Sequence, residues 1–161
     1  MSELAPRRIL TPAPAPLGVL ADVAAGLSLV AAGIHFFVAG PHLQEWWGYG
    51  AFFLATAGGQ AALAVALQWR PPVWLLEAGI GGNLAIVAMY VLSRTNGPPL
   101  GPHTGRAEPA GLLDVTCTVA ELGVIVALLG LLPAAVARRT ASVLAVVGMA
   151  LWTARLTGVL L

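Results

Sequence analysis

The chain has 161 residues, of which 58% are hydrophobic and only 9% are charged, and its net charge is +1. A soluble domain carries about a quarter charged residues, so this composition excludes an ordinary water-soluble protein and favours one surrounded by lipid. The absence of a long basic run argues against nucleic-acid binding, and a single cysteine excludes an intrachain disulfide.

The chain begins with a polar, proline-rich segment over residues 1–16, which we expect to be a disordered tail. Five apolar segments follow, each close to the ~20 residues that cross the ~30 Å hydrocarbon core of a bilayer. They are expected at residues 17–39, 48–68, 73–93, 111–132 and 141–160. The predicted fold is therefore an all-α transmembrane bundle of five helices, forming a single domain over residues 17–161 with an outer loop at 94–110.

Glycines, prolines and arginines mark the boundaries between these segments. The predicted boundaries are Gly40-Pro41, Pro71-Pro72, the loop with its repeated helix breakers, and Pro133 with Arg138-Arg139. We expect Gly40-Pro41 to end the first helix. The turn at Pro71-Pro72 is very short, so the second and third helices must form an antiparallel hairpin.

The arginines predict the orientation of the chain. Five of them fall on the side of the N-terminus, namely Arg7, Arg8, Arg70, Arg138 and Arg139. Only Arg94 and Arg106 fall on the other side. Basic residues are enriched in cytoplasmic loops, so we expect the N-terminus inside and the C-terminus outside the inner (plasma) membrane of a bacterial cell.

Ionisable side chains inside membrane helices are costly and usually face the interior of the bundle. Here they are Asp22, His35, Glu77, Asp114, Glu121 and Arg155. Under the predicted topology all three histidines and four carboxylates fall on the outer side: His35, His42, His103, Glu45, Glu108, Asp114 and Glu121. This one-sided gathering predicts a polar site near the outer face.

The leading hypothesis for that site is a metal centre, because imidazole and carboxylate groups suit a divalent ion or copper. The expected metal ligands are His35, His42, Glu45 and Asp114. His35 and His42 are seven residues apart, so they share a helical face only if the first helix continues past its predicted end. A ligand-binding rim beside this centre is expected from Tyr90, Arg94 and Glu108.

Each of these residues also has a structural interpretation. Asp114 would cap the fourth helix. His35 would form a hydrogen bond with Tyr90 or with a backbone carbonyl. Glu121 and Arg155 match in depth under this topology, and we expect them to form a buried ion pair between the fourth and fifth helices.

Two further alternatives remain open. Carboxylates at staggered depth are typical of a proton or ion path, in which Asp114 and Glu121 would be the outer steps and Glu77 or Asp22 the inner ones. A b-type haem needs axial ligands from facing helices, yet only His35 lies inside a predicted span, so haem is the weaker cofactor hypothesis. Cys117 is interpreted as a small packing residue, since an apolar setting keeps a thiol inert.

Three segments resemble a group of small bacterial multi-pass membrane proteins that have no assigned activity. The segments are IHFFVAGPHLQEWWGYGAFF, LSRTNGPPLGP and EPAGLLDVTCTVAE, within roughly residues 30–125. The shared pattern falls on His35, His42, Glu45, Trp46, Ser93, Arg94, Thr95, Gly97, Pro99, Gly101, Pro102, Glu108, Gly111 and Asp114. The resemblance implies a site, and it leaves His103 outside the pattern.

We therefore expect a non-enzymatic polytopic membrane protein that binds or handles a metal ion or a small polar ligand at its outer face. A membrane redox or haem-binding subunit is one alternative, and a structural partner subunit of a membrane complex is another. The expected partners are the lipid bilayer and either a second copy of the chain or another membrane subunit.

Overall fold

The computed structural model describes residues 16–157, and over that range the chain is helical with no β-strand. The helices are α1 (Pro16–Glu45), α2 (Trp47–Ala66), α3 (Val73–Thr95), α4 (Leu112–Leu131) and α5 (Ala134–Leu156). All five are long and apolar enough to cross a membrane, which confirms the predicted all-α membrane fold. The predicted tail, apart from Pro16, lies outside the described residues.

Two helix boundaries differ from the prediction by six residues or more. α1 does not end at Gly40-Pro41 but continues through Pro41 to Glu45. A proline removes one backbone hydrogen bond, and here it does so close to the end of the helix. Nδ1 of His42 lies 2.7 Å from the carbonyl oxygen of Val38, which adds a hydrogen bond in the same turn. The local loss is therefore partly offset, and the helix gains a further turn.

The fifth helix begins seven residues earlier than predicted, at Ala134. The carbonyl oxygen of Pro133 accepts the first helical hydrogen bond, from the backbone N–H of Ala137 at 2.9 Å. Pro133 thus starts the helix rather than interrupting it, and Arg138 and Arg139 lie inside α5 instead of in the connection.

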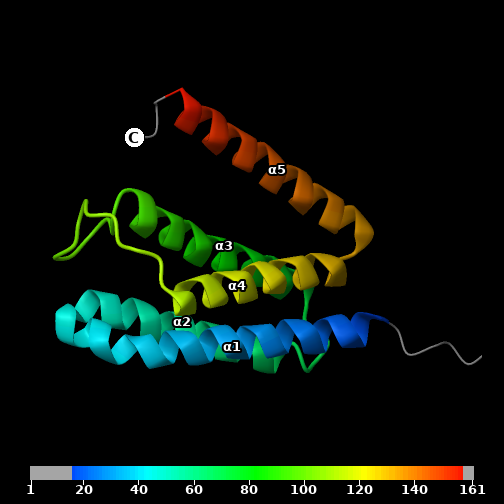
Figure 1. The fold of residues 1–161 in the computed structure, drawn as a ribbon. Coiled ribbons are helices and arrows are strands. Elements are labelled where there is room, and N and C mark those ends of the chain that lie inside the picture. The colour runs from blue at the N-terminus through cyan, green and yellow to red at the C-terminus, as the bar shows by residue number, and fades with distance from the viewer. Residues whose placement is uncertain (1–15, 158–161) are drawn as a thin grey trace, which may run out of the picture.

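α1 to α4 form the packed part of the molecule. α1 packs against α2 and α4, and α3 packs against α4. In Figure 1, α1 and α2 form one layer, with α3 and α4 above them. A Cβ atom at Gly79 would lie 2.8 Å from Leu128 and 3.2 Å from Leu63, so this glycine lets α3 approach both neighbouring helices.

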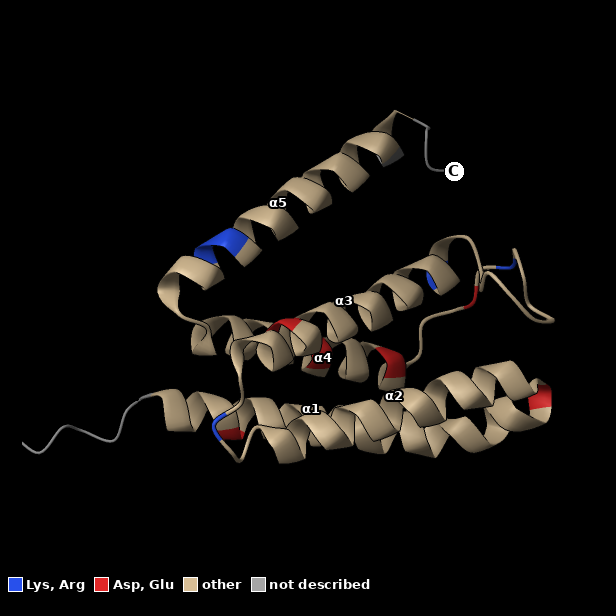
Figure 2. Cartoon of the chain, turned by 180° about the vertical axis from the view of Figure 1, so that it is seen from behind, with Lys and Arg blue, Asp and Glu red and all other residues tan. Residues whose placement is uncertain are grey.

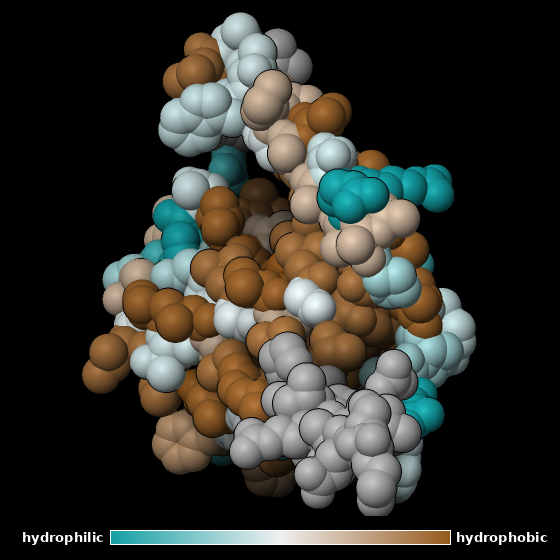
Figure 3. Space-filling model, turned by 90° about the vertical axis from the view of Figure 1, so that its right-hand side faces the viewer, coloured by the Kyte–Doolittle hydropathy of each residue, from teal (hydrophilic) through white to brown (hydrophobic). Residues whose placement is uncertain are grey.

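α5 leaves the bundle after Pro133, and Figure 1 shows it diverging from α3 and α4. Its large apolar side chains, among them Val146, Met149 and Trp152, are exposed, as expected of a helix that faces lipid. Figure 3 views the molecule along the helices from the right-hand side of Figure 1; apolar residues fill the centre of this face, and more hydrophilic residues lie towards its edges.

Successive helices alternate in direction, so their connections gather at two ends. The loop end holds the α1–α2 junction and the long loop before α4, and the turn end holds the other two connections. In Figure 2 long stretches of the helices carry no charged residue. Under the N-in orientation, which remains a prediction, the loop end is the outer face.

A chain of neutral polar groups crosses the bundle in the half nearer the turn end. The hydroxyl of Ser28 donates to the backbone carbonyl of Gln60 at 2.8 Å, and Nε2 of Gln60 donates to Oδ1 of Asn83 at 2.9 Å. Nδ2 of Asn83 donates to the carbonyl of Gly79 at 2.8 Å. These groups satisfy one another, as buried polar groups must in lipid. Asp22 and Glu77, the inner steps of the ion-path alternative, are exposed on the bundle surface.

Candidate functional site

A cavity of about 400 Å³ lies at the loop end, with walls from α1, α2, α3, α4 and the loop before α4. Most of its wall is apolar or aromatic, including Trp46, Trp47, Tyr49, Phe52, Phe53, Ile86 and Met89. Polar side chains line it in two groups. We call His35, Cys117 and Glu121 the base cluster, and Tyr90, Arg94, Glu108 and Asp114 the rim.

The depth of the two groups follows from α4. Asp114 lies in the first turn of this helix, and Glu121 is seven residues further along. At 1.5 Å per residue the base cluster is therefore ~10 Å deeper in the bundle than the rim.

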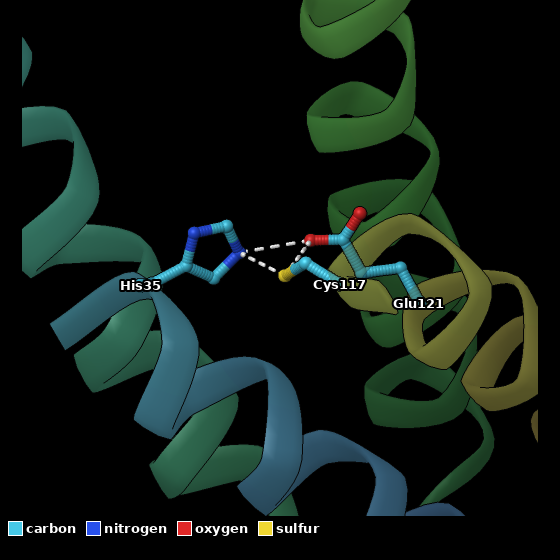
Figure 4. A group of neighbouring side chains, drawn as sticks. All are labelled: His35, Cys117 and Glu121. Atoms are coloured by element: carbon cyan, nitrogen blue, oxygen red, sulfur yellow. Dashed lines mark hydrogen bonds and ion pairs between the residues drawn. The ribbon is translucent and has the colours of Figure 1, made fainter. Parts of the chain in front are cut away.

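The base cluster converges on one point, as Figure 4 shows. Nε2 of His35 lies 2.8 Å from Oε1 of Glu121 and 3.4 Å from Sγ of Cys117. Sγ of Cys117 lies 3.6 Å from the same Glu121 oxygen. His35 is 5% exposed, Cys117 5% and Glu121 1%, so all three groups are withdrawn from the surface.

Helix packing brings these three side chains together. Cys117 and Glu121 are four residues apart on α4, so they share one face of that helix. Ala31 and Ala120 are buried with Cys117 where α1 meets α4. These small residues permit a close approach of the two helices, and His35, one turn after Ala31, reaches across to the carboxylate.

The geometry of the base cluster differs from that of a nucleophilic cysteine triad. In such a triad the imidazole contacts the nucleophile through one nitrogen and the orienting carboxylate through the other. Here the same atom, Nε2 of His35, faces both Cys117 and Glu121. Among the described residues Nδ1 of His35 is a buried atom without a hydrogen-bond partner. The arrangement therefore surrounds a point between three donor atoms.

Two of the three distances within the base cluster match those between the ligands of a metal ion. With bond lengths of ~2.0 Å to nitrogen and oxygen and ~2.3 Å to sulfur, tetrahedral ligand atoms are about 3.3 to 3.6 Å apart. The distances from Sγ of Cys117, 3.4 and 3.6 Å, match this range. The distance of 2.8 Å between His35 and Glu121 is that of a hydrogen bond. This distance would widen by about 0.5 Å if a metal ion bound between the two groups in place of the hydrogen bond.

The rim is an ion-pair network. Nη1 of Arg94 lies 2.9 Å from a carboxylate oxygen of Glu108, and Nη2 lies 3.1 Å from Oδ2 of Asp114. The guanidinium carbon lies 5.3 Å from the ring centroid of Tyr90, within the range of a cation–π contact. The same Oδ2 of Asp114 accepts a hydrogen bond from the backbone N–H of Gly111 at 2.8 Å, which caps α4.

His103 connects this rim to the end of α1. Its Nδ1 lies 3.2 Å from Glu108, and its Nε2 lies 2.9 Å from Glu45, the last residue of α1. The hydroxyl of Tyr49 donates to the carbonyl of Leu100 at 2.9 Å and accepts from the backbone N–H of His103 at 3.3 Å. The loop is thereby held against the cavity, where its residues Pro98 to Leu100 form part of the wall.

The four predicted metal ligands do not assemble into one group. In the part of the chain that the structure describes, the group with at least three potential metal ligand atoms within 4.8 Å of one another is the base cluster. Of the predicted set only His35 belongs to it. His42 bonds to Val38 and packs on the ring of Phe53 at 4.4 Å, Glu45 pairs with His103, and Asp114 pairs with Arg94.

The predicted rim residues do come together. Arg94 contacts Glu108 and Tyr90 directly, and Asp114 joins them instead of serving the metal group. The predicted ion pair of Glu121 with Arg155 involves a side chain outside the described residues. In the structure the Glu121 carboxylate has His35 and Cys117 as partners. Sequence reasoning missed Cys117, which it assigned to packing alone.

Comparison of the chain with protein-family models, with curated proteins and with solved structures finds no match.

Proposed function

We propose that this chain is a membrane protein that binds one divalent metal ion, such as zinc, through His35, Cys117 and Glu121. The observation that supports this most directly is the convergence of three buried donor atoms, from two helices, within 4.8 Å of one another. An imidazole, a thiolate and a carboxylate are all ligands that zinc accepts in proteins.

Charge balance favours the same proposal. A buried carboxylate or thiolate is expensive in a medium of low dielectric constant unless an opposite charge accompanies it. A divalent ion balances the thiolate of Cys117 and the carboxylate of Glu121, and the imidazole of His35 binds as a neutral group. The complete site would therefore be neutral inside the membrane.

The surroundings indicate how an ion and a further ligand would reach the site. Three protein ligands leave a fourth coordination position, which is the usual arrangement where a metal binds a small molecule or water. The base cluster lines the cavity, so this position has space beside it. At the rim two carboxylates outnumber Arg94, which favours the approach of cations.

The haem alternative lacks a second axial ligand in a suitable place. His42 is the other histidine that lines the cavity, but it lies on α1 together with His35. A b-type haem is commonly held by two histidines from facing helices. The proposed cofactor is therefore a metal ion alone.

Metal analysis of the purified protein tests the proposal. The chain is produced without a polyhistidine tag, loaded with zinc, freed of unbound metal, and analysed by mass spectrometry of the elements. We expect about one zinc per wild-type chain, and a loss of at least tenfold in affinity for Cys117→Ala, since one of three ligands is removed. His42→Ala and His103→Ala are the matched controls and should retain zinc. The proposal would be refuted if the wild-type protein held no zinc, or if Cys117→Ala bound zinc as tightly as the wild-type protein.

A further inference from the structure

The cavity beside the base cluster has the lining of a site for a flat, apolar molecule. Aromatic side chains from two helices form its wall, including Tyr49, Phe52 and Phe53 on α2 and Tyr90 on α3. Its volume of about 400 Å³ lies in the range of small-molecule pockets, which are mostly apolar with a few placed polar groups. Aromatic walls stack favourably on a ring compound.

The position of the cavity indicates a route from the lipid. α2 and α3 meet towards the turn end, where Gln60 contacts Asn83 and Leu63 lies against Gly79. Towards the loop end, residues from both helices line the cavity instead. The wall residues Trp47 and Phe52 are both exposed, at 70% and 37%. An apolar ligand that enters between the two helices would therefore meet apolar side chains along its way.

The charges around the cavity select against an anion. Arg94 is the one arginine among the described residues that line it, and both Glu108 and Asp114 already bind this arginine. An anionic head group would meet the carboxylates of Glu108 and Asp114 at the rim. A neutral ligand avoids this repulsion.

His35 supplies a recognition group for such a ligand, and this step rests on the proposed metal site. When Nε2 binds a metal, the neutral imidazole carries its proton on Nδ1. Metal-binding histidines almost always donate that N–H to an acceptor. Here Nδ1 is buried and unpartnered among the described residues, and Figure 4 shows it on the side of the ring away from Glu121. The ring lies 5.8 Å from Phe53, a wall residue of the cavity.

We propose that the cavity binds a neutral, membrane-soluble ring compound with a carbonyl oxygen, of the quinone type, which reaches it from the bilayer between α2 and α3. The ring packs on Phe52 and Phe53. Nδ1 of His35 has almost no accessible surface, so a shift of the neighbouring side chains accompanies the hydrogen bond that the carbonyl oxygen accepts from it.

Quenching of tryptophan fluorescence by duroquinone tests this binding in zinc-loaded protein in phosphatidylcholine nanodiscs. Trp46 and Trp47 line the cavity, so they become the sole reporters after Trp69, Trp74 and Trp152 are replaced by Phe. We expect quenching that saturates with duroquinone concentration. Durene has the same methylated ring without oxygens, and it should compete about tenfold more weakly because it lacks one hydrogen bond.

A matched pair of threonine substitutions on α4 locates the site. Thr118 lines the cavity, whereas Thr116 is exposed on the same helix. Thr118→Phe should fill the cavity and weaken the saturable quenching at least tenfold, and Thr116→Phe should leave it unchanged. Quenching that never saturates, that responds equally to both substitutions, or that lauric acid abolishes more effectively than durene would overturn the inference.

Zinc is measured in the same samples. Zinc-loaded protein without saturable quenching overturns the ligand inference alone. Protein that takes up no zinc refutes the proposed metal site instead.

Discussion

Arg94 holds the rim together, and its replacement by methionine should destabilise the loop end. Its guanidinium lies 2.9 Å from Glu108 and 3.1 Å from Asp114, and the side chain is 20% exposed. Methionine keeps most of the length of the side chain but removes the charge, so two carboxylates are left facing each other. Exposed ion pairs contribute at most ~1 kcal/mol, and breaking a buried pair costs about 3 to 5 kcal/mol. The partners are 29% and 35% exposed, so screening reduces the effect to about 2 kcal/mol.

Thermal unfolding in detergent measures this loss. A change of 1 kcal/mol shifts Tm by roughly 2 to 4 °C for a chain of this size, so Arg94→Met should lower Tm by roughly 4 to 8 °C. Arg106→Met is the control, because Arg106 is exposed in the loop and should shift Tm by less than ~1 °C. Adding Glu108→Gln and Asp114→Asn to Arg94→Met should recover more than half of the loss, because the repulsion disappears while Asn can still cap α4.

Two outcomes would refute this reasoning about the rim. One is an equal Tm for Arg94→Met and Arg106→Met, which would mean that the network contributes no more than a solvated arginine. The other is a further fall in Tm when the two carboxylates are neutralised, which would mean that they are stabilised by something other than Arg94.

Three further predictions concern packing, buried polar groups and orientation. Gly79→Leu should lower Tm, because the new side chain would collide with Leu63 and Leu128. Gly81→Leu is the control and should leave Tm unchanged, because a Cβ atom at Gly81 would have nothing within 4 Å. An equal fall in Tm for both substitutions would contradict the packing at Gly79. Gln60→Leu should destabilise by about 1 to 3 kcal/mol because Asn83 loses its partner, and exposed Gln68→Leu should be near neutral in the same unfolding assay. Thr104→Cys in a Cys117→Ala background should react with a membrane-impermeant maleimide added outside intact spheroplasts; reaction only after lysis would reverse the predicted orientation.

The number of helices could be predicted from the sequence because hydropathy, length and helix breakers all mark them. The end of α1 and the start of α5 could not be predicted, because a proline has different effects at different positions in a helix. Pro41 lies so close to the end of α1 that the helix continues to Glu45. Pro133 provides the first carbonyl acceptor of α5 and therefore begins a helix where a break was expected.

The error at the end of α1 also explains why the base cluster was missed. A helix end near residue 39 puts His35 four residues, or ~6 Å, from that end and therefore close to the outer face. With α1 ending at Glu45, His35 is ten residues from the end, or ~15 Å deep. Glu121 is nine residues after the start of α4, or ~14 Å deep. The two residues therefore match in depth, which a correct helix end would have revealed.

Other features of the site depend on which helices pack together. Hydropathy does not specify that α1 meets α4, because this contact is made by small residues such as Ala31 and Ala120. Without that contact, Glu121 was assigned to Arg155 and Cys117 to packing. The rim was predictable in part, because Arg94 and Asp114 lie at the two ends of one loop and Glu108 lies within it, all on the same side of the predicted bundle.

X-ray absorption at the zinc edge, on zinc-loaded protein in lipid, tests the central claim most directly because it reports the ligand atoms themselves. The proposed site predicts one sulfur at ~2.3 Å together with nitrogen and oxygen ligands at ~2.0 to 2.1 Å. Cys117→Ser should lose the sulfur shell, because Cys117 is the one cysteine of the chain. A spectrum of the wild-type protein with nitrogen and oxygen ligands alone would contradict the assignment of Cys117 and with it the base cluster as the metal site.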